Sequence, residues 1–348
     1  MIYKLILFSF LSFLITSCGS NTSSSSSQFL TGITYDSTSG KLIVLDYGQN
    51  IVQSVSSLTG TATLTTLAGS SGNSGTTNST GTLSRFYGPQ GVVSDSSGNF
   101  FVSDLYNHVI RKITSPYSTA SVTTFAGYMS TSGSADGATT AAYFFYPRGI
   151  AIDSSNNIYV ADSANHTIRT ISSAGVVSTL AGYAGTSGYA NGTSSSARFS
   201  YPNAVATDGT NVFVADTANN QVRQIVLSTG VVTLLAGSST GISGYTNATG
   251  SSAYFYTPVG IATDGTNVYV TDYNNHSIRQ IVISTGVVTT LAGNTSGQSG
   301  FVDSTGTSAY FNYPLGITYN SGYLYITDQG GSHIRKVSTT TGIVTTLY

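Results

Sequence analysis

Residues 201–237 read YPNAVATDGTNVFVADTANNQVRQIVLSTGVVTLLAG, and this stretch decides the fold. It contains four short runs rich in Val, Ile, Tyr and Thr, which are separated by Gly, Asn, Asp and Ser. Runs of this kind are typical of β-strands, and no helical period lies between them. Residues 208–211 are typical of a tight hairpin turn. We therefore expect four antiparallel strands in this unit.

The same unit occurs six times between residues 29 and 348. Its proline recurs every 55 to 58 residues, and Leu30 takes the place of the proline in the first unit. Four-stranded units at even spacing are typical of propeller blades, whereas an open solenoid would need distinct end units. We predict an all-β, six-bladed β-propeller of four-stranded antiparallel blades. The blades are expected at approximately residues 29–69, 86–127, 144–182, 199–237, 255–293 and 311–348.

One part of the unit resembles a known family. Residues 157–169 read NIYVADSANHTIR and are similar to an NHL repeat, which is named for its Asn-His-Leu core. The Asn-His pair stands at Asn107-His108, Asn165-His166 and Asn275-His276, and is replaced by Gln49-Asn50, Asn219-Asn220 and Gly331-Ser332 in the other units. The resemblance implies the propeller fold. It leaves function open, because NHL propellers include RNA binders, protein-binding modules, receptor domains and a lyase.

The composition excludes several classes of protein. Charged residues make up 7% of the chain, against about 25% in an average protein. There are 12 Lys and Arg residues and 13 acidic residues, and every acidic residue is Asp. A coiled coil would need Glu- and Lys-rich heptads, and a nucleic-acid binder would need a basic face. A disordered chain would lack the 40% hydrophobic content.

Most of the scarce charges stand at fixed positions of the repeat. An Asp ends the second strand of each unit, and an Arg follows seven residues later in five units. With a turn at residues 163–166, Asp162 and Arg169 lie on one face of the blade as diagonal neighbours. We expect structural ion pairs here, because catalytic residues would differ between blades. The set comprises Asp46, Asp104, Asp162, Asp216, Asp272 and Asp328, with Gln53, Arg111, Arg169, Arg223, Arg279 and Arg335.

Two further polar sets recur at turns. His108, His166 and His276 occupy one turn position on three separate blades, which is a poor arrangement for ligating one metal ion. We expect them to shape the turn, and the alternative is a His-lined channel mouth.

A second Asp set ends the innermost strand. An Asx turn is the simpler interpretation of this set, and a Ca²⁺- or Mg²⁺-binding ring is the alternative. This set is Asp36, Asp95, Asp153, Asp208 and Asp264, with Asn320 in the last unit.

Loops of 19 or 20 residues connect the units, and their similar lengths indicate that they are ordered. We expect them to form a crown on the face where the fourth strand leads into the next unit. A Phe three residues before each proline is expected to anchor the loop through a short helical turn. These anchors are Phe86, Phe144, Phe199, Phe255 and Phe311. The candidate loop contacts to a partner are Tyr189, Tyr245 and Phe301.

The residue after the proline varies between units although its place in the repeat is kept. We expect it at the channel mouth, where it reads Thr31, Gln90, Arg148, Asn203, Val259 and Leu315 in chain order. One side of this ring is polar and the other apolar, as a small-ligand or peptide site requires. Drift at a tolerant position is the alternative explanation. The candidate binding mouth comprises Gln90, Arg148 and Asn203 with His108, His166 and His276.

The N-terminus predicts export. Lys4 precedes an apolar run at residues 5–15, which is too short to span a bilayer and fits a signal peptide over residues 1–17. Residues 15–18 read ITSC and resemble the lipobox of bacterial lipoproteins, which implies a lipid on Cys18. Residues 18–28 then form a lipidated, Ser-rich tether. The expected location is the outer membrane or the cell surface of a bacterium.

We interpret the chain as a lipid-anchored, surface-exposed and non-catalytic binding scaffold for a protein or glycan partner, without a cofactor. The N-terminal lipid provides its membrane contact, and no nucleic acid is expected as a partner. The alternative is a propeller enzyme of the lyase or lactone hydrolase type with a metal in the central channel. The sequence offers no acid–base pair, nucleophile–base pair or ligand cluster for such an enzyme.

Overall fold

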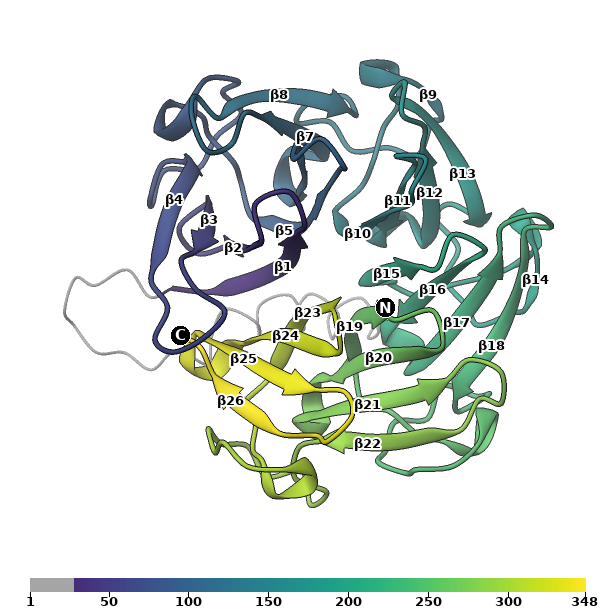
Figure 1. Ribbon diagram of the computed structural model, residues 1–348. Coiled ribbons are helices and arrows are strands. Elements are labelled where there is room, and N and C mark those ends of the chain that lie inside the picture. The colour runs from purple at the N-terminus through teal and green to yellow at the C-terminus, as the bar shows by residue number, and fades with distance from the viewer. Residues whose placement is uncertain (1–27) are drawn as a thin grey trace.

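The computed structural model describes residues 28–348 and contains six antiparallel sheets. Each sheet is one blade, and the six blades form a ring around a central channel (Figure 1). The blades follow one another in chain order, so that blade 6 lies beside blade 1. The predicted all-β, six-bladed propeller is therefore confirmed.

The strand bounds are as follows. Blade 1 consists of β1 (Leu30–Asp36), β2 (Lys41–Asp46), β3 (Ile51–Val55) and β4 (Leu64–Gly69), and blade 2 of β5 (Pro89–Ser94), β6 (Phe100–Asp104), β7 (Val109–Thr114) and β8 (Ser121–Ala126). Blade 3 consists of β10 (Pro147–Ile152), β11 (Ile158–Asp162), β12 (Thr167–Ile171) and β13 (Val176–Gly182), and blade 4 of β15 (Ala204–Thr207), β16 (Asn211–Asp216), β17 (Gln221–Val226) and β18 (Val231–Gly237). Blade 5 consists of β19 (Pro258–Thr263), β20 (Asn267–Asp272), β21 (Ser277–Val282) and β22 (Val288–Ala292), and blade 6 of β23 (Pro314–Asn320), β24 (Tyr323–Asp328), β25 (His333–Ser338) and β26 (Val344–Thr346).

Single turns of 3-10 helix occur in two recurring places. Those in the connecting loops are η1 (Gly81–Leu83), η3 (Thr139–Ala141), η5 (Ser194–Ser196), η7 (Gly250–Ser252) and η9 (Gly306–Ser308). Those between the second and third strands are η2 (Leu105–Asn107), η4 (Ser163–Asn165), η6 (Thr217–Asn219), η8 (Tyr273–Asn275) and η10 (Gln329–Gly331).

The register within a blade agrees with the expected pairing, since Asp162 faces Thr167 and Val160 faces Arg169. Antiparallel pairing also fixes the two faces of the ring. The face on which the first strands begin carries Pro147 and its counterparts, together with the turns that follow the second strands. We call it the proline face. The opposite face carries the turns between the first and second strands, such as residues 153–157.

The connecting loops do not simply form a crown on the proline face; each also runs along the outer edge of the blade that follows it. In blade 3, β9 (Gly137–Ala138) pairs with β13, and in blade 4, β14 (Gly192–Thr193) pairs with β18. These two sheets therefore have five strands, where four were expected. Loop residues Thr80, Thr249 and Thr305 make single bridges to the outer edge in the other three cases. The pairing covers backbone groups that an edge strand would leave unpaired.

The loop anchors lie where they were expected. All five phenylalanines are fully buried, and a 3-10 turn precedes each one. The hydrophobic core lies between blades rather than within one: Phe101 and Ile110 of blade 2 share a buried cluster with Phe144 and Ile150 at blade 3. The same arrangement joins blade 6 to blade 1. Each blade thus needs its neighbours to bury its apolar faces.

Around the channel, the innermost strands approach one another at backbone distance. A Cβ on Gly149 would lie 2.7 Å from the Cα of Ala204 in the next blade, and a Cβ on Gly260 would collide with the carbonyl oxygen of Leu315. The Gly149 N–H donates to the Asn203 carbonyl over 2.8 Å. Packing therefore favours glycine at this position in five blades, whereas blade 4 carries Ala204 there.

The ring closes without exchange of a strand, because the four strands of blade 1 and those of blade 6 are each consecutive in the chain. At this seam, Thr327 Oγ1 donates to the Thr31 carbonyl over 2.7 Å. The Ala62 N–H donates to the Leu347 carbonyl over 2.8 Å.

None of the helices within residues 28–348 combines the length and the apolar character needed to cross a membrane. The expected signal peptide at residues 1–17 and the lipidated Cys18 lie outside the described residues, as does all of the tether except Gln28.

Candidate functional site

The recurring Asp and Arg form a buried network at each of five blades, as expected. In blade 3, Arg169 Nη1 donates to Asp162 Oδ2 over 2.7 Å, and both side chains are fully buried. Asn165 Nδ2 donates to the same oxygen over 2.7 Å, while Asp162 Oδ1 accepts the Phe145 N–H over 2.7 Å. The Asn of the NHL motif thus holds the carboxylate beside the arginine.

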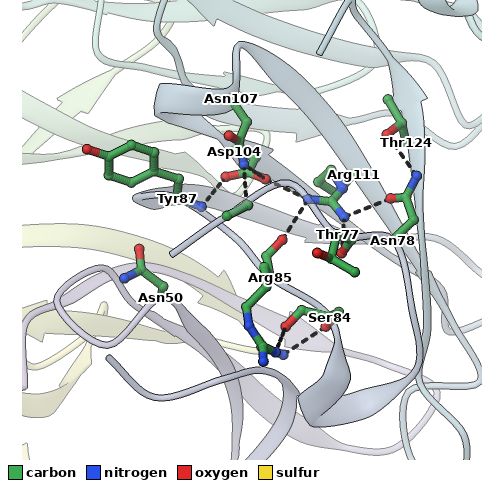
Figure 2. A network of polar contacts seen from close by, with 12 residues as sticks. Asn50, Thr77, Asn78, Ser84, Arg85, Tyr87, Asp104, Asn107, Arg111 and Thr124 are labelled. Carbon is green, nitrogen blue, oxygen red and sulfur yellow. Dashed lines mark hydrogen bonds and ion pairs between the residues drawn. The ribbon is translucent and has the colours of Figure 1, made fainter. Parts of the chain in front are cut away.

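Each arginine also ties down the preceding loop. Figure 2 shows this in blade 2, where Arg111 Nη2 donates to the Thr77 carbonyl and to Asn78 Oδ1 over 3.1 and 2.7 Å. Its Nη1 donates to the Arg85 carbonyl over 2.9 Å as well as to Asp104. The ion pair therefore connects two strands and a loop of one blade.

A third recurring polar position was missed by the sequence analysis. It holds Asn78, Asp136, Asn191, Asn247 and Asp303, each of which accepts a hydrogen bond from the arginine of its blade. The residues stand 32 or 33 positions before the arginine, and this constant spacing was the available signal. Asp136 and Asp303 are therefore structural partners and not spare carboxylates.

The carboxylate and the guanidinium of each of the five pairs are fully buried. Burial raises the pKa of Asp162 to about 6, and the positive charge of Arg169 opposes the shift.

Blade 1 differs because Gln53 replaces the arginine. There the buried Asp46 Oδ2 and Gln53 Oε1 have no hydrogen-bond partner among residues 28–348, and burial raises the pKa of Asp46.

The histidines connect one blade to the next. His166 ends the 3-10 turn η4 in the left-handed region at φ 59°, and its Nδ1 accepts the N–H of Tyr201 in blade 4 over 3.1 Å. His108 and His276 accept the corresponding N–H groups of Tyr146 and Tyr313. The bond requires a neutral ring, and burial lowers the pKa of His166 to about 4. These contacts agree with the turn-shaping interpretation.

The same bond is made without histidine elsewhere in the ring. Asn50 Oδ1 accepts the Gly88 N–H over 2.8 Å, and Asn220 Oδ1 accepts the Thr257 N–H over 2.9 Å. In all five cases the acceptor bonds to a residue with positive φ, and that residue directly precedes the proline of the following blade. The requirement is therefore for an acceptor rather than for imidazole chemistry.

The second Asp set closes turns on the opposite face. Asp153 Oδ1 accepts the N–H groups of Ser155 and Asn157, both over 2.9 Å. Burial alone would raise the pKa of Asp153, but these hydrogen bonds and one from Tyr159 outweigh it and lower the pKa. The Asx-turn interpretation agrees with this geometry. Asp153 lies on a cavity of about 360 Å³ with Asp208 and Asp264. No group of three or more His, Cys, Asp or Glu residues in the described part of the chain could hold a metal ion.

The residues after the proline meet at the channel as expected, with one exception. Gln90 and Asn203 line a cavity of about 70 Å³ in the channel. Thr31, Val259 and Leu315 complete the ring around it. Arg148 belongs to the same ring by position, but it is not part of this lining. Burial lowers the pKa of Arg148, and tyrosines of three blades, Tyr47, Tyr106 and Tyr146, oppose the shift.

The three loop candidates differ in exposure. Tyr189 is 54% exposed, and Phe301 is exposed with its ring 4.8 Å from that of His333. Tyr245 is partly buried: its hydroxyl is hydrogen-bonded to Thr290 Oγ1, and its ring lies 4.7 Å from the Arg279 guanidinium carbon. Tyr245 therefore supports the network of its own blade.

Comparison with known families gives three matches. The NHL repeat model matches residues 86–113, 144–171 and 255–281. These segments belong to blades 2, 3 and 5, which are the blades that contain an Asn-His pair. The match thus follows the residues that link each of these blades to the next.

Two curated relatives are 27% identical to this chain. They are Protein SUPPRESSOR OF QUENCHING 1, chloroplastic, from Arabidopsis thaliana and NHL repeat-containing protein 2 from Bos taurus. The alignments cover 74% and 75% of this chain but only 25% and 40% of those proteins. The chain therefore spans well under half the length of either relative.

Among solved structures, an auxiliary nutrient binding protein from Bacteroides thetaiotaomicron has a TM-score of 0.64 at 13% identity, covering 92% of this chain and 70% of its own. Virginiamycin B lyase from Staphylococcus aureus has a TM-score of 0.53 at 15% identity, covering 92% and 84%. At these identities the likeness concerns the fold. The chain therefore contains NHL repeats, matched in blades 2, 3 and 5, within a six-bladed β-propeller.

Proposed function

We propose that this chain is a non-catalytic scaffold that binds a protein or glycan partner on its proline face. The observation that carries the proposal is a difference between two kinds of polar side chain: the aspartates are used in structural hydrogen bonds, whereas several tyrosines are exposed. The aspartates are engaged in hydrogen bonds within blades, loops and turns, as Asp162, Asp136 and Asp153 illustrate. Three tyrosines of the proline face, by contrast, are exposed.

The accessible tyrosines lie where first strands begin. Tyr87, Tyr201 and Tyr256 stand one or two residues before the prolines of blades 2, 4 and 5 and are 46%, 38% and 42% exposed. Tyrosine offers a large contact area at low cost in conformational entropy, and its hydroxyl can bond to a polar partner. A ring of such side chains suits recognition more than acid–base catalysis.

We further propose that the scaffold is exported and anchored by a lipid on Cys18 at the outer membrane or surface of a bacterium. The signal-type run and the lipobox-like residues support this. The described chain starts at the seam between blades 1 and 6, where Tyr348 Oη donates to Gln28 Oε1 over 2.8 Å. A tether of about ten residues has a reach of about 18 Å, which would keep the propeller close to the membrane.

Proximity labelling on intact cells tests the proposed partner binding. The full chain is compared with a variant that carries Tyr87→Ser, Tyr201→Ser and Tyr256→Ser. We expect a small set of proteins or glycoconjugates to be labelled by the full chain and lost with the variant. Labelling that is identical for both would contradict binding through the proline face. A stoichiometric metal in the purified chain would favour the enzyme alternative.

Incorporation of a fatty-acid analogue tests the anchor. The unchanged chain should be labelled and sediment with membranes, whereas Cys18→Ser should be unlabelled. Labelling of Cys18→Ser at the unchanged level would contradict the anchor.

A further inference from the structure

Arg148 differs from every other arginine in the molecule. Arg111, Arg169, Arg223, Arg279 and Arg335 each pair with an Asp. Arg85 and Arg198 donate to backbone carbonyls of their own loops. The Arg148 guanidinium has no ion pair and no side-chain hydrogen bond within residues 28–348. It is partly exposed at the start of β10, in the ring of residues that surrounds the channel mouth.

Three tyrosines form an aromatic cluster on the side of the mouth to which Arg148 belongs. Tyr47 and Tyr106 are joined by a hydrogen bond of 2.8 Å between their hydroxyls, and the ring of Tyr146 lies 5.6 Å from that of Tyr106. The three tyrosines come from blades 1, 2 and 3. Burial lowers the pKa of Arg148, and the hydroxyls of these three tyrosines oppose the shift. The cluster therefore gathers three blades around one unpaired cation.

A departure from the repeat makes room for the cluster. Gly88 stands before the proline of blade 2, where blades 3, 4 and 6 carry tyrosine. A Cβ on Gly88 would lie 2.9 Å from Tyr106 Cδ2 and 3.0 Å from Tyr47 Cε2. The small residue thus allows both rings to pack at the mouth. The spacing of the repeat is thus unchanged here, while the residue at this position differs from the tyrosine of blades 3, 4 and 6.

From this arrangement we propose that Arg148, with Tyr47, Tyr106 and Tyr146, binds the carboxylate of an acidic sugar. The inference rests on the proposed function and names the ligand class for the proline face. A guanidinium pairs with a carboxylate through two parallel hydrogen bonds. Tyrosine rings offer flat faces to a sugar ring, and the amides of Gln90 and Asn203 on the adjacent channel lining can bond to its hydroxyl groups.

The shape of the mouth favours a terminal sugar over a deeply buried ligand. Pockets that enclose a small molecule usually have volumes of about 300–1,000 Å³. The cavity within the channel has about 70 Å³, so it can receive only a group of the size of a hydroxyl, and Arg148 does not line it. The carboxylate and the rest of the ligand would lie outside this cavity, beside Arg148 and the partly exposed Tyr47, Tyr106 and Tyr146.

The backbone at the mouth disfavours capture of a peptide C-terminus. Such capture uses free N–H groups arranged as a nest. Here the Gly91 N–H donates to Ser103 Oγ over 2.8 Å, and the Gly316 N–H donates to Thr327 Oγ1 over 2.8 Å. The Gly149 N–H likewise donates a hydrogen bond, to the Asn203 carbonyl. Arg148 is therefore the anion-binding group that the mouth provides.

A glycan array with the full chain, purified in detergent, tests the inference. The array carries oligosaccharides that end in glucuronate, galacturonate or a sialic acid, each beside its carboxyl-reduced form and beside sulfated and phosphorylated sugars. We expect at least one acidic glycan to bind about tenfold or more tightly than its reduced form. Arg148→Gln should lose this preference, and Arg148→Lys should retain part of it. Arg85→Gln removes the same charge away from the mouth and should bind as the unchanged chain does.

Several results would overturn the inference. These are no binding to any carboxylated glycan, equal binding to the reduced forms, a preference for sulfate or phosphate, or full binding by Arg148→Gln. The melting temperature of Arg148→Gln should stay within about 2 °C of the unchanged chain, because the guanidinium has no partner to lose. Repeating the proximity labelling with this variant separates the two proposals. Unchanged labelling means that a partner binds elsewhere on the proline face, whereas no labelling by the unchanged chain contradicts the proposed function itself.

Discussion

Arg169 and Arg148 belong to the same blade, and their surroundings differ in every respect that matters for function. Arg169 is fully buried, pairs with Asp162 and Asp136, and donates to two carbonyls. Arg148 is partly exposed and has no partner in the described part of the chain. The first environment recurs at five blades and the second occurs once. The recurring polar contacts hold the ring together, whereas Arg148 takes no part in them and is the centre of the proposed binding site.

The largest effect is expected from breaking the recurring network. Arg169→Met should lower the free energy of unfolding by about 3–5 kcal/mol, because it leaves Asp162 buried without its cation. Denaturant titration measures the change. Arg148→Met is the matched control and should shift stability by less than about 0.5 kcal/mol. Equal losses for the two variants would remove the distinction between the two regions.

The close approach of the innermost strands gives the second effect. Gly260→Ala should destabilise the ring by about 1–3 kcal/mol, since the added Cβ collides with the Leu315 carbonyl oxygen. Ala204→Gly, at the one blade where alanine stands in this position, should cost no more than about 1 kcal/mol. Thermal melting of both variants checks the order. A harmless Gly260→Ala would show that the mouth can widen.

The histidine contact gives the third effect, and it depends on pH. The pKa of His166 is about 4 in the folded chain against 6.5 for an ordinary histidine, so the unfolded chain binds the proton more readily. Its contribution to stability is therefore complete above pH 6.5 and is lost as the pH falls towards 4. The expected loss is about 1–2 kcal/mol, less than the full shift implies because solvent screens part of the interaction.

The test compares unfolding of the unchanged chain and His166→Asn at pH 7 and pH 4.5. Asn50 and Asn220 already make this bond in other blades, so the variant should be close to the unchanged chain at pH 7 and less sensitive to acid. The aspartates titrate in both proteins and cancel in the difference. Equal acid sensitivity would contradict the assignment to His166.

The smallest effect is expected at the exceptional blade. Asp46→Asn should change stability by less than about 1 kcal/mol, because Oδ1 can still accept the Phe29 and Gln49 N–H groups and no arginine loses its partner. Asp162→Asn should cost about 3 kcal/mol, since it removes the buried carboxylate with which Arg169 pairs. Denaturation of the two variants side by side gives the comparison. A loss at Asp46 as large as that at Asp162 would mean that blade 1 holds its carboxylate as firmly as the others.

Much of the fold could be predicted from the sequence because its signals are local. The pairing of Asp162 with Arg169 follows from strand period and turn length within seven residues, and it is confirmed. The role of Asp136 could not be obtained in this way, because its partner lies 33 residues further along the chain. The Nδ1 contact of His166 reaches Tyr201 in the next blade, 35 residues away. Such contacts form only when loop and blades pack.

The mouth shows the same limit. Five of the six residues that follow the proline or Leu30 line the channel cavity, as expected from their shared place in the repeat. Arg148 and the three histidines of the candidate mouth do not line it. The role of Arg148 was not visible, because Tyr47, Tyr106 and Arg148 come from three blades and are brought together only by the closed ring.

The sequence by itself determined the number of blades, their strand order and the register within each blade, because alternation, turns and spacing are properties of a single repeat. The tertiary structure alone decided the path of the loops, the partners of the histidines and the isolation of Arg148. Those features depend on which side chains meet across the interfaces between blades, and only the closed ring sets these distances.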